Sequence, residues 1–103
     1  MEVEEYSSKT LNNDVNLDVQ PNPGYCPVTV SYVLKQGASV ICRVYDASGR
    51  VVRDLISAYQ TDAKQSVIWD RKDQNGHPVT AGVYFVRLQA GESVNQVKLV
   101  IVD

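Results

Sequence analysis

A chain of 103 residues has the length of one domain and can bury about two-thirds of its unfolded surface around a single core. Its 12 acidic and 10 basic residues leave a net charge of -2, which excludes the strongly basic surface of nucleic-acid-binding proteins. No run approaches the ~18 apolar residues of a membrane-spanning helix, and the acidic start lacks the apolar core of a secretory signal. We therefore expect a monomeric domain that binds no nucleic acid and has no membrane span.

From about residue 15 onward, the apolar residues repeat with the period of two that is typical of strands. Residues 1–15 are polar and non-periodic, and we expect a linker or N-terminal extension there, with the domain at residues 16–103. Gly, Pro, Asn or Asp bounds each alternating run. In chain order, the runs predict strands at 15–20, 28–34, 39–46, 50–57, 65–70, 82–89 and 94–102.

The segment PNPGYCP, residues 21–27, separates the first two runs. Its three prolines remove three backbone donors, so this segment cannot be a central strand. It also contains Cys26, which with Cys42 completes the pair of cysteines, and neither has the spacing of a zinc ligand. We expect Cys42 to be a small buried hydrophobe and Cys26 a loop thiol. A bridge between them stays open, because nothing in the sequence fixes the distance between the two Cα atoms.

The run RVVRDLISAYQ, residues 50–60, also fits a helix. Its apolar residues match the i, i+3, i+4, i+7 spacing at Val52, Leu55, Ile56 and Tyr59. However, β-branched residues near its start lower helix propensity, and the turn at Asp46–Gly49 before it suits a hairpin. We therefore predict a strand here.

Short strands at intervals of roughly 10 to 12 residues favour an antiparallel sandwich or barrel over a βαβ fold. Tyr84 begins a strand two residues after Gly82, as in the tyrosine corner of immunoglobulin-like sandwiches, where the phenol hydrogen-bonds to the chain just upstream. The sequence therefore predicts an all-β, seven-stranded antiparallel immunoglobulin-like β-sandwich. Its predicted interior contains Val30, Tyr32, Val40, Cys42, Val44, Val67, Trp69, Tyr84, Val86 and Leu88.

The polar loop in WDRKDQNGHPVTAGVYFVRL, residues 69–88, contains the residues that a chemical site would use. Asp70, Asp73 and Asn75 before Gly76 resemble part of a calcium-binding loop. Such a loop needs a bidentate Glu six residues after the Gly, and the following HPVTAGV contains no acidic residue. We therefore expect a turn with no metal or other cofactor, in which Asn75-Gly76 provides the positive φ and Asp70 caps the backbone amides.

His77 is the single histidine of the sequence, and it precedes a proline in this turn. A general base must be held by a second group, so we expect a solvated side chain. Trp69 could stack on a sugar, but it shares a strand face with Val67, which favours a place in the core. The sequence contains no GxGxxG, phosphate-binding loop or HExxH motif, and its acidic residues lie mostly in turns. We predict no catalytic residue and no enzymatic activity.

Four segments carry a family resemblance: PNP at 21–23, VYDASGRVV at 44–52, VIWDRKDQNGHPVTAGVYFVRL at 67–88 and KLVIV at 98–102. They resemble, in order and spacing over about residues 16–103, a group of C-terminal immunoglobulin-like domains related to the Ig-like domain of the flagellar hook-capping protein. The pattern WD…NG.PV..GVYF.RL is specific. In the family, a hydrophobic or aromatic residue and then Asn-Pro usually follow PNP, whereas this chain has GYCP. We therefore expect a differently built first turn.

In the larger branch of this family, such domains end secreted proteins of Bacteroidetes-type bacteria and serve as type IX secretion sorting domains. The resemblance implies a non-catalytic C-terminal sorting and attachment domain of a secreted or cell-surface bacterial protein. Its partners would be outer-membrane secretion machinery or upstream domains of the same protein. The alternative is a structural or binding module: a hook-cap-like assembly domain, a spacer, or a polysaccharide-binding sandwich of a secreted enzyme. The candidate interaction residues are Pro21, Asn22, Pro23, Gly82, Val83, Tyr84, Lys98, Val100 and Val102.

The last predicted strand indicates where a partner would bind. Leu99 and Ile101 alternate with Lys98, Val100 and Val102, so the second face of this strand is unusually apolar. An apolar strip beside an unpaired edge is a template for β-augmentation by a partner. The alternative is a strand covered by the protein's own loops or N-terminal residues. Periodicity does not separate the two, and the family resemblance favours a partner surface.

Overall fold

The computed structural model describes residues 16–24, 27–61 and 63–102. These residues contain strands and no helix, and hence no helix that could span a membrane. The predicted linker at residues 1–15 lies outside the described residues. The strands are β1 (Asp18–Gln20), β2 (Val28–Val33), β3 (Ala38–Asp46), β4 (Val51–Gln60), β5 (Lys64–Trp69), β6 (Gly82–Ala90) and β7 (Ser93–Ile101).

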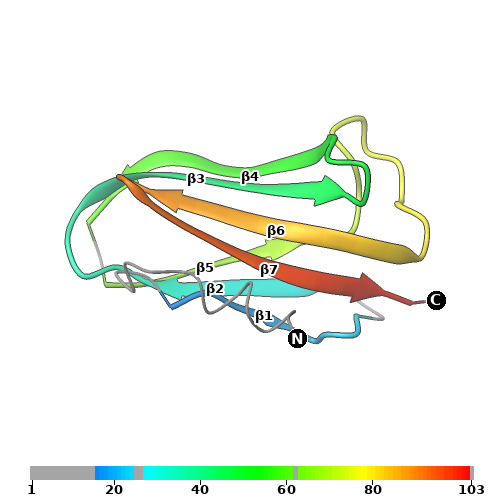
Figure 1. Cartoon of the computed structure of the whole chain (residues 1–103), viewed down its shortest axis with the longest axis horizontal. Coiled ribbons are helices and arrows are strands. Elements are labelled where there is room, and N and C mark those ends of the chain that lie inside the picture. The colour runs from blue at the N-terminus through cyan, green and yellow to red at the C-terminus, as the bar shows by residue number, and fades with distance from the viewer. Residues whose placement is uncertain (1–15, 25–26, 62, 103) are drawn as a thin grey trace.

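The strands form two sheets that face each other (Figure 1). One sheet has the order β1-β2-β5 and the other the order β4-β3-β6-β7. All neighbouring strands pair antiparallel. The loop after β5 crosses from the first sheet to the second, where β6 begins. This is the all-β immunoglobulin-like sandwich that the sequence predicts.

β4 is a strand, as predicted, although its apolar spacing resembles that of a helix. It pairs with β3 along its length, with register shifts directly after Cys42 and Val44. A β-bulge adds a residue on one strand and so changes which residues face the core. As a result, the adjacent residues Leu55 and Ile56 are both half-buried against the core. The helix-like spacing therefore comes from bulges in a strand.

The core lies between the sheets and takes alternate residues from each strand. Nine of the ten predicted interior residues are buried, and the tenth, Val67, is half-buried and packs against the others. β7 contributes Leu99 and Ile101, which are 0% and 1% exposed. Because the inward positions alternate with outward ones, the polar residues between them face solvent without cost to the core.

Trp69 and Tyr84 connect the two sheets at one end of the core. The rings meet edge to face, with centroids 6.0 Å apart and planes at 65°. The Trp69 indole N–H donates a hydrogen bond to the Lys72 carbonyl at 2.9 Å. The Tyr84 hydroxyl donates to the Thr80 carbonyl at 2.7 Å, which confirms the predicted tyrosine corner. Each aromatic residue thus buries its ring and still satisfies its polar atom.

Cys42 is a free, fully buried thiol. Burial raises its pKa to about 12, so the thiol stays protonated at neutral pH and is a poor nucleophile. This agrees with the predicted role of Cys42 as a small hydrophobe. Cys26 lies outside the described residues.

Replacing Trp69 by Ala should destabilise the fold severely. Trp69 is 1% exposed, and its removal leaves a cavity and takes away one of the two hydrogen bonds that the Lys72 carbonyl accepts. We expect a loss of about 3–5 kcal/mol in the free energy of unfolding, measured by chemical denaturation. Ile68→Ala is the matched control, because this neighbour is 65% exposed, and it should change stability by less than ~0.5 kcal/mol. An equal effect of the two substitutions would contradict the assignment of Trp69 to the core.

Candidate functional site

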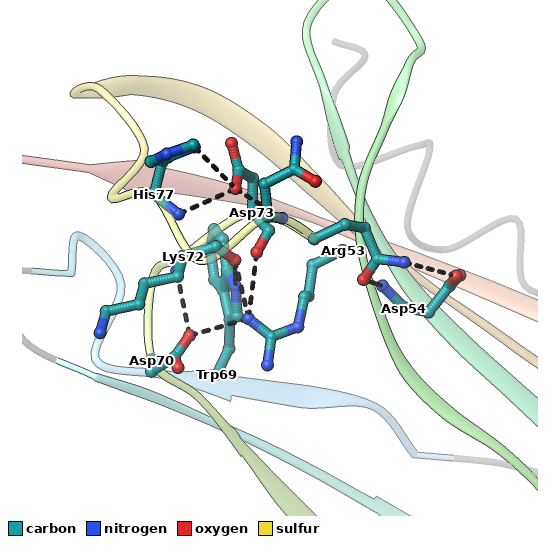
Figure 2. A network of polar contacts seen from close by, with 9 residues as sticks. Arg53, Asp54, Trp69, Asp70, Lys72, Asp73 and His77 are labelled. Carbon is teal, nitrogen blue, oxygen red and sulfur yellow. Dashed lines mark hydrogen bonds and ion pairs between the residues drawn. The ribbon is translucent and has the colours of Figure 1, made fainter.

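Asp73 organises the polar loop between β5 and β6 (Figure 2). Its Oδ1 accepts hydrogen bonds from the backbone N–H groups of Asn75 and His77, each at 2.9 Å. Its carbonyl accepts a third from Gly76 at 3.0 Å. The bond from the His77 amide, followed by that from Asn75, lowers the pKa of the Asp73 carboxyl. The loop is therefore a turn centred on one carboxylate.

Two details of this turn differ from the sequence-based expectation. Asp70 caps the Lys72 amide, at 3.0 Å, while Asp73 caps the amides around the Asn-Gly pair. Of that pair, Gly76 alone has a positive φ, 84°, and the other positive φ of the loop is at Arg71, 67°. Each aspartate accepts from the amide two residues further on, as in an Asx turn, and Asp73 has the larger capping role because it also accepts from the His77 amide.

Arg53 of β4 fastens this loop to the four-stranded sheet, as Figure 2 shows. Its Nη1 donates to Asp70 Oδ1 and to the Lys72 carbonyl, both at 3.1 Å, and to the Asp73 carbonyl at 3.4 Å. One guanidinium nitrogen thus serves acceptors from three loop residues. Sequence reasoning did not identify Arg53, because only the fold brings β4 beside the loop.

Gln74 covers part of the outer edge of β4. Its backbone N–H donates to the Val52 carbonyl at 3.0 Å. Its side-chain Oε1 accepts from the Asp54 amide at 3.0 Å, and its Nε2 donates to Asp54 Oδ2 at 3.1 Å. Gln74 therefore occupies two backbone groups of β4 that an added strand would otherwise use, the Val52 carbonyl with its own amide and the Asp54 amide with its side chain.

The loop shows none of the geometry of a catalytic centre. The His77 side chain is 75% exposed, and its Nδ1 lies 3.9 Å from an Asp73 oxygen that already accepts two backbone bonds. The described residues contain no group of three or more His, Cys, Asp or Glu that could hold a metal ion. We therefore interpret this loop as a structural crossover between the sheets.

A depression of about 400 Å³ lies between this loop and the turn that joins β3 to β4. Its two carboxylates belong to Asp46 and Asp73, and both serve their own turns. Asp46 Oδ1 accepts from the Ser48 hydroxyl at 2.6 Å, the Ser48 amide at 2.9 Å and the Arg50 amide at 3.0 Å. These contacts, the Ser48 hydroxyl foremost, lower the pKa of Asp46 to about 2. In both aspartates, Oδ1 is engaged in holding a turn.

The outer edge of β7 is paired with the protein's own PNPG segment, so the prediction of an unpaired edge is wrong over residues 98–102. Asn22 Nδ2 donates to the Lys98 carbonyl at 2.9 Å, and Asn22 Oδ1 accepts from the Val100 amide at 3.1 Å. Gly24 donates to the Val100 carbonyl at 2.8 Å and accepts from the Val102 amide at 2.9 Å. The alternative that the sequence left open, coverage by the protein itself, applies along this part of the strand.

A small residue suits position 24 because the backbone passes close to its neighbours. A Cβ there would lie 3.1 Å from Val28 Cγ2 and 3.2 Å from the Pro21 carbonyl oxygen. Gly24 also forms a parallel bridge with Ile101. Gly24 is the first residue of GYCP, the segment in which this chain departs from the family pattern. Its small size lets the backbone pair with β7.

The structure brings several predicted interaction residues together although they are distant in sequence. Val83 of β6 pairs with Val100 of β7. Asn22 bonds to the β7 backbone on both sides of Leu99, at the Lys98 carbonyl and the Val100 amide. We call this group the β7-edge surface; it comprises Asn22, Val83, Lys98, Val100 and Val102. Lys98 is exposed, whereas Val83, Val100 and Val102 are half-buried.

The other predicted interaction residues support this surface instead of lining it. Tyr84 points into the core and is 7% exposed, so its role is the tyrosine corner. Gly82 lies opposite Ile101 in the sheet. Pro21 and Pro23 are exposed on either side of Asn22. No periodic pattern in the sequence indicates that the Asn22 side chain reaches β7, because the contact joins residues 76 and 78 positions apart.

Residues 18–101 match the family described as the FlgD Ig-like domain. This match confirms the resemblance to the hook-capping Ig-like domain that the motifs indicate. No curated protein sequence matches the chain.

Solved structures that share the fold include PorU, PorZ and FlgD. The dimeric latent PorU of Porphyromonas gingivalis matches with a TM-score of 0.73 and 21% identity over 85% of this chain and 9% of PorU. PorZ, described as an essential surface component of the type IX secretion system of the same organism, matches with a TM-score of 0.63 and 20% identity over 94% of this chain and 12% of PorZ. FlgD from P. aeruginosa has a TM-score of 0.59 and 24% identity over 85% of this chain and 69% of FlgD. The chain thus corresponds to a small part of PorU and of PorZ.

Calcium should have no effect on this protein. The acidic side chains of the loop are engaged with backbone amides and Arg53, and the stretch after Gly76 lacks the Glu that a calcium loop needs. Calorimetric titration with calcium should therefore show no binding heat, and EDTA should leave the melting temperature unchanged. A shift of several degrees would show that a metal site exists.

Acid should destabilise the fold through its turn carboxylates. The pKa of Asp46 is lowered to about 2 and that of Asp73 is also lowered, against an ordinary value of 3.8. A carboxylate with a depressed folded-state pKa stabilises the protein above its unfolded-state pKa, and that contribution is lost as the pH falls from 3.8 towards 2. The melting temperature should fall over this window, and the fall should be shallower in the Asp46→Asn, Asp73→Asn double variant. An unchanged slope would contradict this account.

Proposed function

Because the chain belongs to the FlgD Ig-like domain family, we propose that it is a non-catalytic recognition module that directs a secreted bacterial protein to the cell surface. The support comes from the likeness of its fold to parts of PorU and PorZ, the second of which is described as a surface component of a secretion system. In this proposal the domain is monomeric and is recognised by outer-membrane secretion machinery. Its family and its structurally engaged polar loop favour recognition over chemistry.

The observation that carries the proposal is the convergence of Asn22, Val83, Lys98 and Val100 at the β7-edge surface. Asn22 fixes the backbone of β7 on both sides of Leu99, a core residue with 0% exposure. Lys98 and Val100 are therefore held on a rigid strand with their side chains turned away from the core. A rigid surface loses little conformational entropy when a partner binds.

The mode of recognition differs from the β-augmentation that the sequence suggested. Strand addition at residues 98–102 would have to displace four hydrogen bonds from Asn22 and Gly24. Each of these bonds contributes about 1 kcal/mol to stability, so displacement would be costly. We propose that the partner contacts the side chains of the β7-edge surface and leaves the strand pairing in place.

A second function, that of an assembly module or spacer, is favoured by the match to FlgD, of which the aligned region covers 69%. In that case the β7-edge surface would contact upstream domains of the same protein. The two functions differ in whether the isolated domain is sufficient to direct export.

The test fuses the whole chain to an inert reporter in a bacterium with type IX export and measures the reporter at the cell surface. The wild-type fusion should reach the surface, and a Lys98→Ala, Val100→Ala double variant should retain most of the reporter in the periplasm. The matched control is Lys64→Ala, because Lys64 is an exposed lysine of β5 on the other sheet. Circular dichroism checks that each variant is folded.

Point variants are needed because deletion of residues 98–103 would also remove the buried Leu99 and Ile101 and the partners of Asn22. Surface delivery by the folded double variant would disprove the assigned role of this surface. Retention of the wild-type fusion in the periplasm would instead favour the assembly function.

A further inference from the structure

The outward face of β3, β6 and β7 carries the cations Arg43, Arg87 and Lys98, and within the described residues Arg43 alone of the three is paired with a carboxylate, that of Asp54 on β4. Residues on this face alternate with the buried Cys42, Val44, Val86, Leu88 and Leu99. Arg43 of β3 lies directly opposite Arg87 of β6, and Lys98 of β7 lies opposite Phe85 of β6. No Asp or Glu occupies an outward position of these three strands. Like charges placed opposite each other destabilise a sheet. Asp54 compensates the charge of Arg43, which leaves Arg87 and Lys98 as the cations that an added anion could neutralise.

An ion pair between β3 and β4 shows how an arginine of this face binds a carboxylate. Arg43 Nε donates to Asp54 Oδ1 at 2.7 Å, from the opposite position on β4. A hydrogen bond with Tyr45, and then the bond and the charge of Asp54, raise the pKa of Arg43. Arg87 is one strand further from Asp54, and Gln96 stands opposite it on β7. Within the described part of the chain, no carboxylate pairs with Arg87 or Lys98.

A depression of about 230 Å³ lies beside Arg43 and Arg87. It is lined by Ile41, Arg43, Tyr45, Arg87 and Gln89. The two guanidinium groups can each donate to a carboxylate, and Gln89 adds an amide that can donate or accept. The depression therefore presents charged donors, with an aliphatic and an aromatic side chain at its sides.

We propose that the outward face of β3, β6 and β7 binds an extended acidic peptide segment of a partner protein, with one carboxylate on Arg87 and a second on Lys98. This deepens the proposed function by naming the chemistry of the partner, and it rests on that function only for the biological setting. The face is continuous with the β7-edge surface through Lys98.

The spacing of the two cations favours an extended peptide. Lys98 is the diagonal neighbour of Arg87, because Phe85 pairs with Lys98 and Arg87 pairs with Gln96. Diagonal neighbours in an antiparallel sheet are roughly 7–8 Å apart. In an extended chain, residues i and i+2 face the same side and lie about 6.6 Å apart. A Glu-x-Glu segment thus matches the pair of cations.

The experiment titrates the whole domain with a synthetic peptide that alternates Glu and Ser, and follows the amide signals of β6 and β7 by NMR. Two reference peptides accompany it: one with Gln in place of every Glu, and one of the same composition with Glu at every third position. We expect the alternating peptide to bind, the Gln peptide to show no binding, and the third peptide to bind more weakly. Higher ionic strength should weaken the binding.

Single substitutions test whether the peptide binds at Arg87 and Lys98. Arg87→Gln and Lys98→Gln should each weaken binding roughly three- to tenfold. Arg50→Gln is the matched control, since Arg50 is an exposed arginine in the turn after β3 with a side chain 83% exposed, and it should change nothing. All these side chains are exposed, so the melting temperatures should remain close to that of the wild type.

Three outcomes would overturn the proposal: no binding of the alternating peptide, equal affinity of Arg87→Gln and wild type, or Arg87-dependent binding of an oligogalacturonate in place of the peptide. The last would assign the face to an acidic glycan. Because this measurement uses the purified domain, its result does not depend on export. Loss of export in the fusion assay with peptide binding intact would separate the two proposals.

Discussion

The contact between Trp69 and Tyr84 is the interaction on which the rest of this sandwich depends. Trp69 ends the three-stranded sheet, Tyr84 lies near the start of β6 in the other sheet, and their rings meet edge to face in the core. Each also bonds to a carbonyl of the crossover loop, Trp69 at Lys72 and Tyr84 at Thr80. Both ends of the loop are thereby fixed to the core. The loop can then carry Gln74 to the edge of β4, with Arg53 holding its middle.

Both outer strands of the larger sheet are protected by a side-chain carboxamide. Asn22 occupies the Lys98 carbonyl and the Val100 amide of β7, and Gln74 occupies the Asp54 amide of β4. A carboxamide has one acceptor and one donor group, as a peptide unit has, so it can take the place of a neighbouring strand without extending the sheet. Edge protection of this kind opposes edge-to-edge aggregation. It also leaves the outward side chains of the sheet, and not the backbone of its edges, as the accessible part of this surface.

Much of this fold could be predicted from the sequence because strand alternation is a local signal. The alternation identified the strands and most of the core, and the spacing of Gly82 and Tyr84 identified the tyrosine corner. β4 was ambiguous because register shifts beside Cys42 and Val44 alter its period, and a bulge depends on the partner strand. The pairing of Asn22 with β7 was not predictable, since it joins residues 76 positions apart through a side chain. Arg53 was missed for the same reason: its acceptors are nearby only in the folded protein.

The residues of the family motif determine how the domain folds. They do not determine what the domain binds. WD, NG and GVYF supply the core tryptophan, the turn glycine and the tyrosine corner, and these residues build the crossover. The outward residues Arg43, Arg87 and Lys98 alternate with this framework and contribute little to the core. Substitution of outward residues can therefore change the chemistry of the sheet face without unfolding the domain. This separation explains how proteins as different as PorZ and FlgD can contain the same fold at 20% and 24% identity to this chain. The determinants of function are then to be sought on the sheet face and not in the family motif.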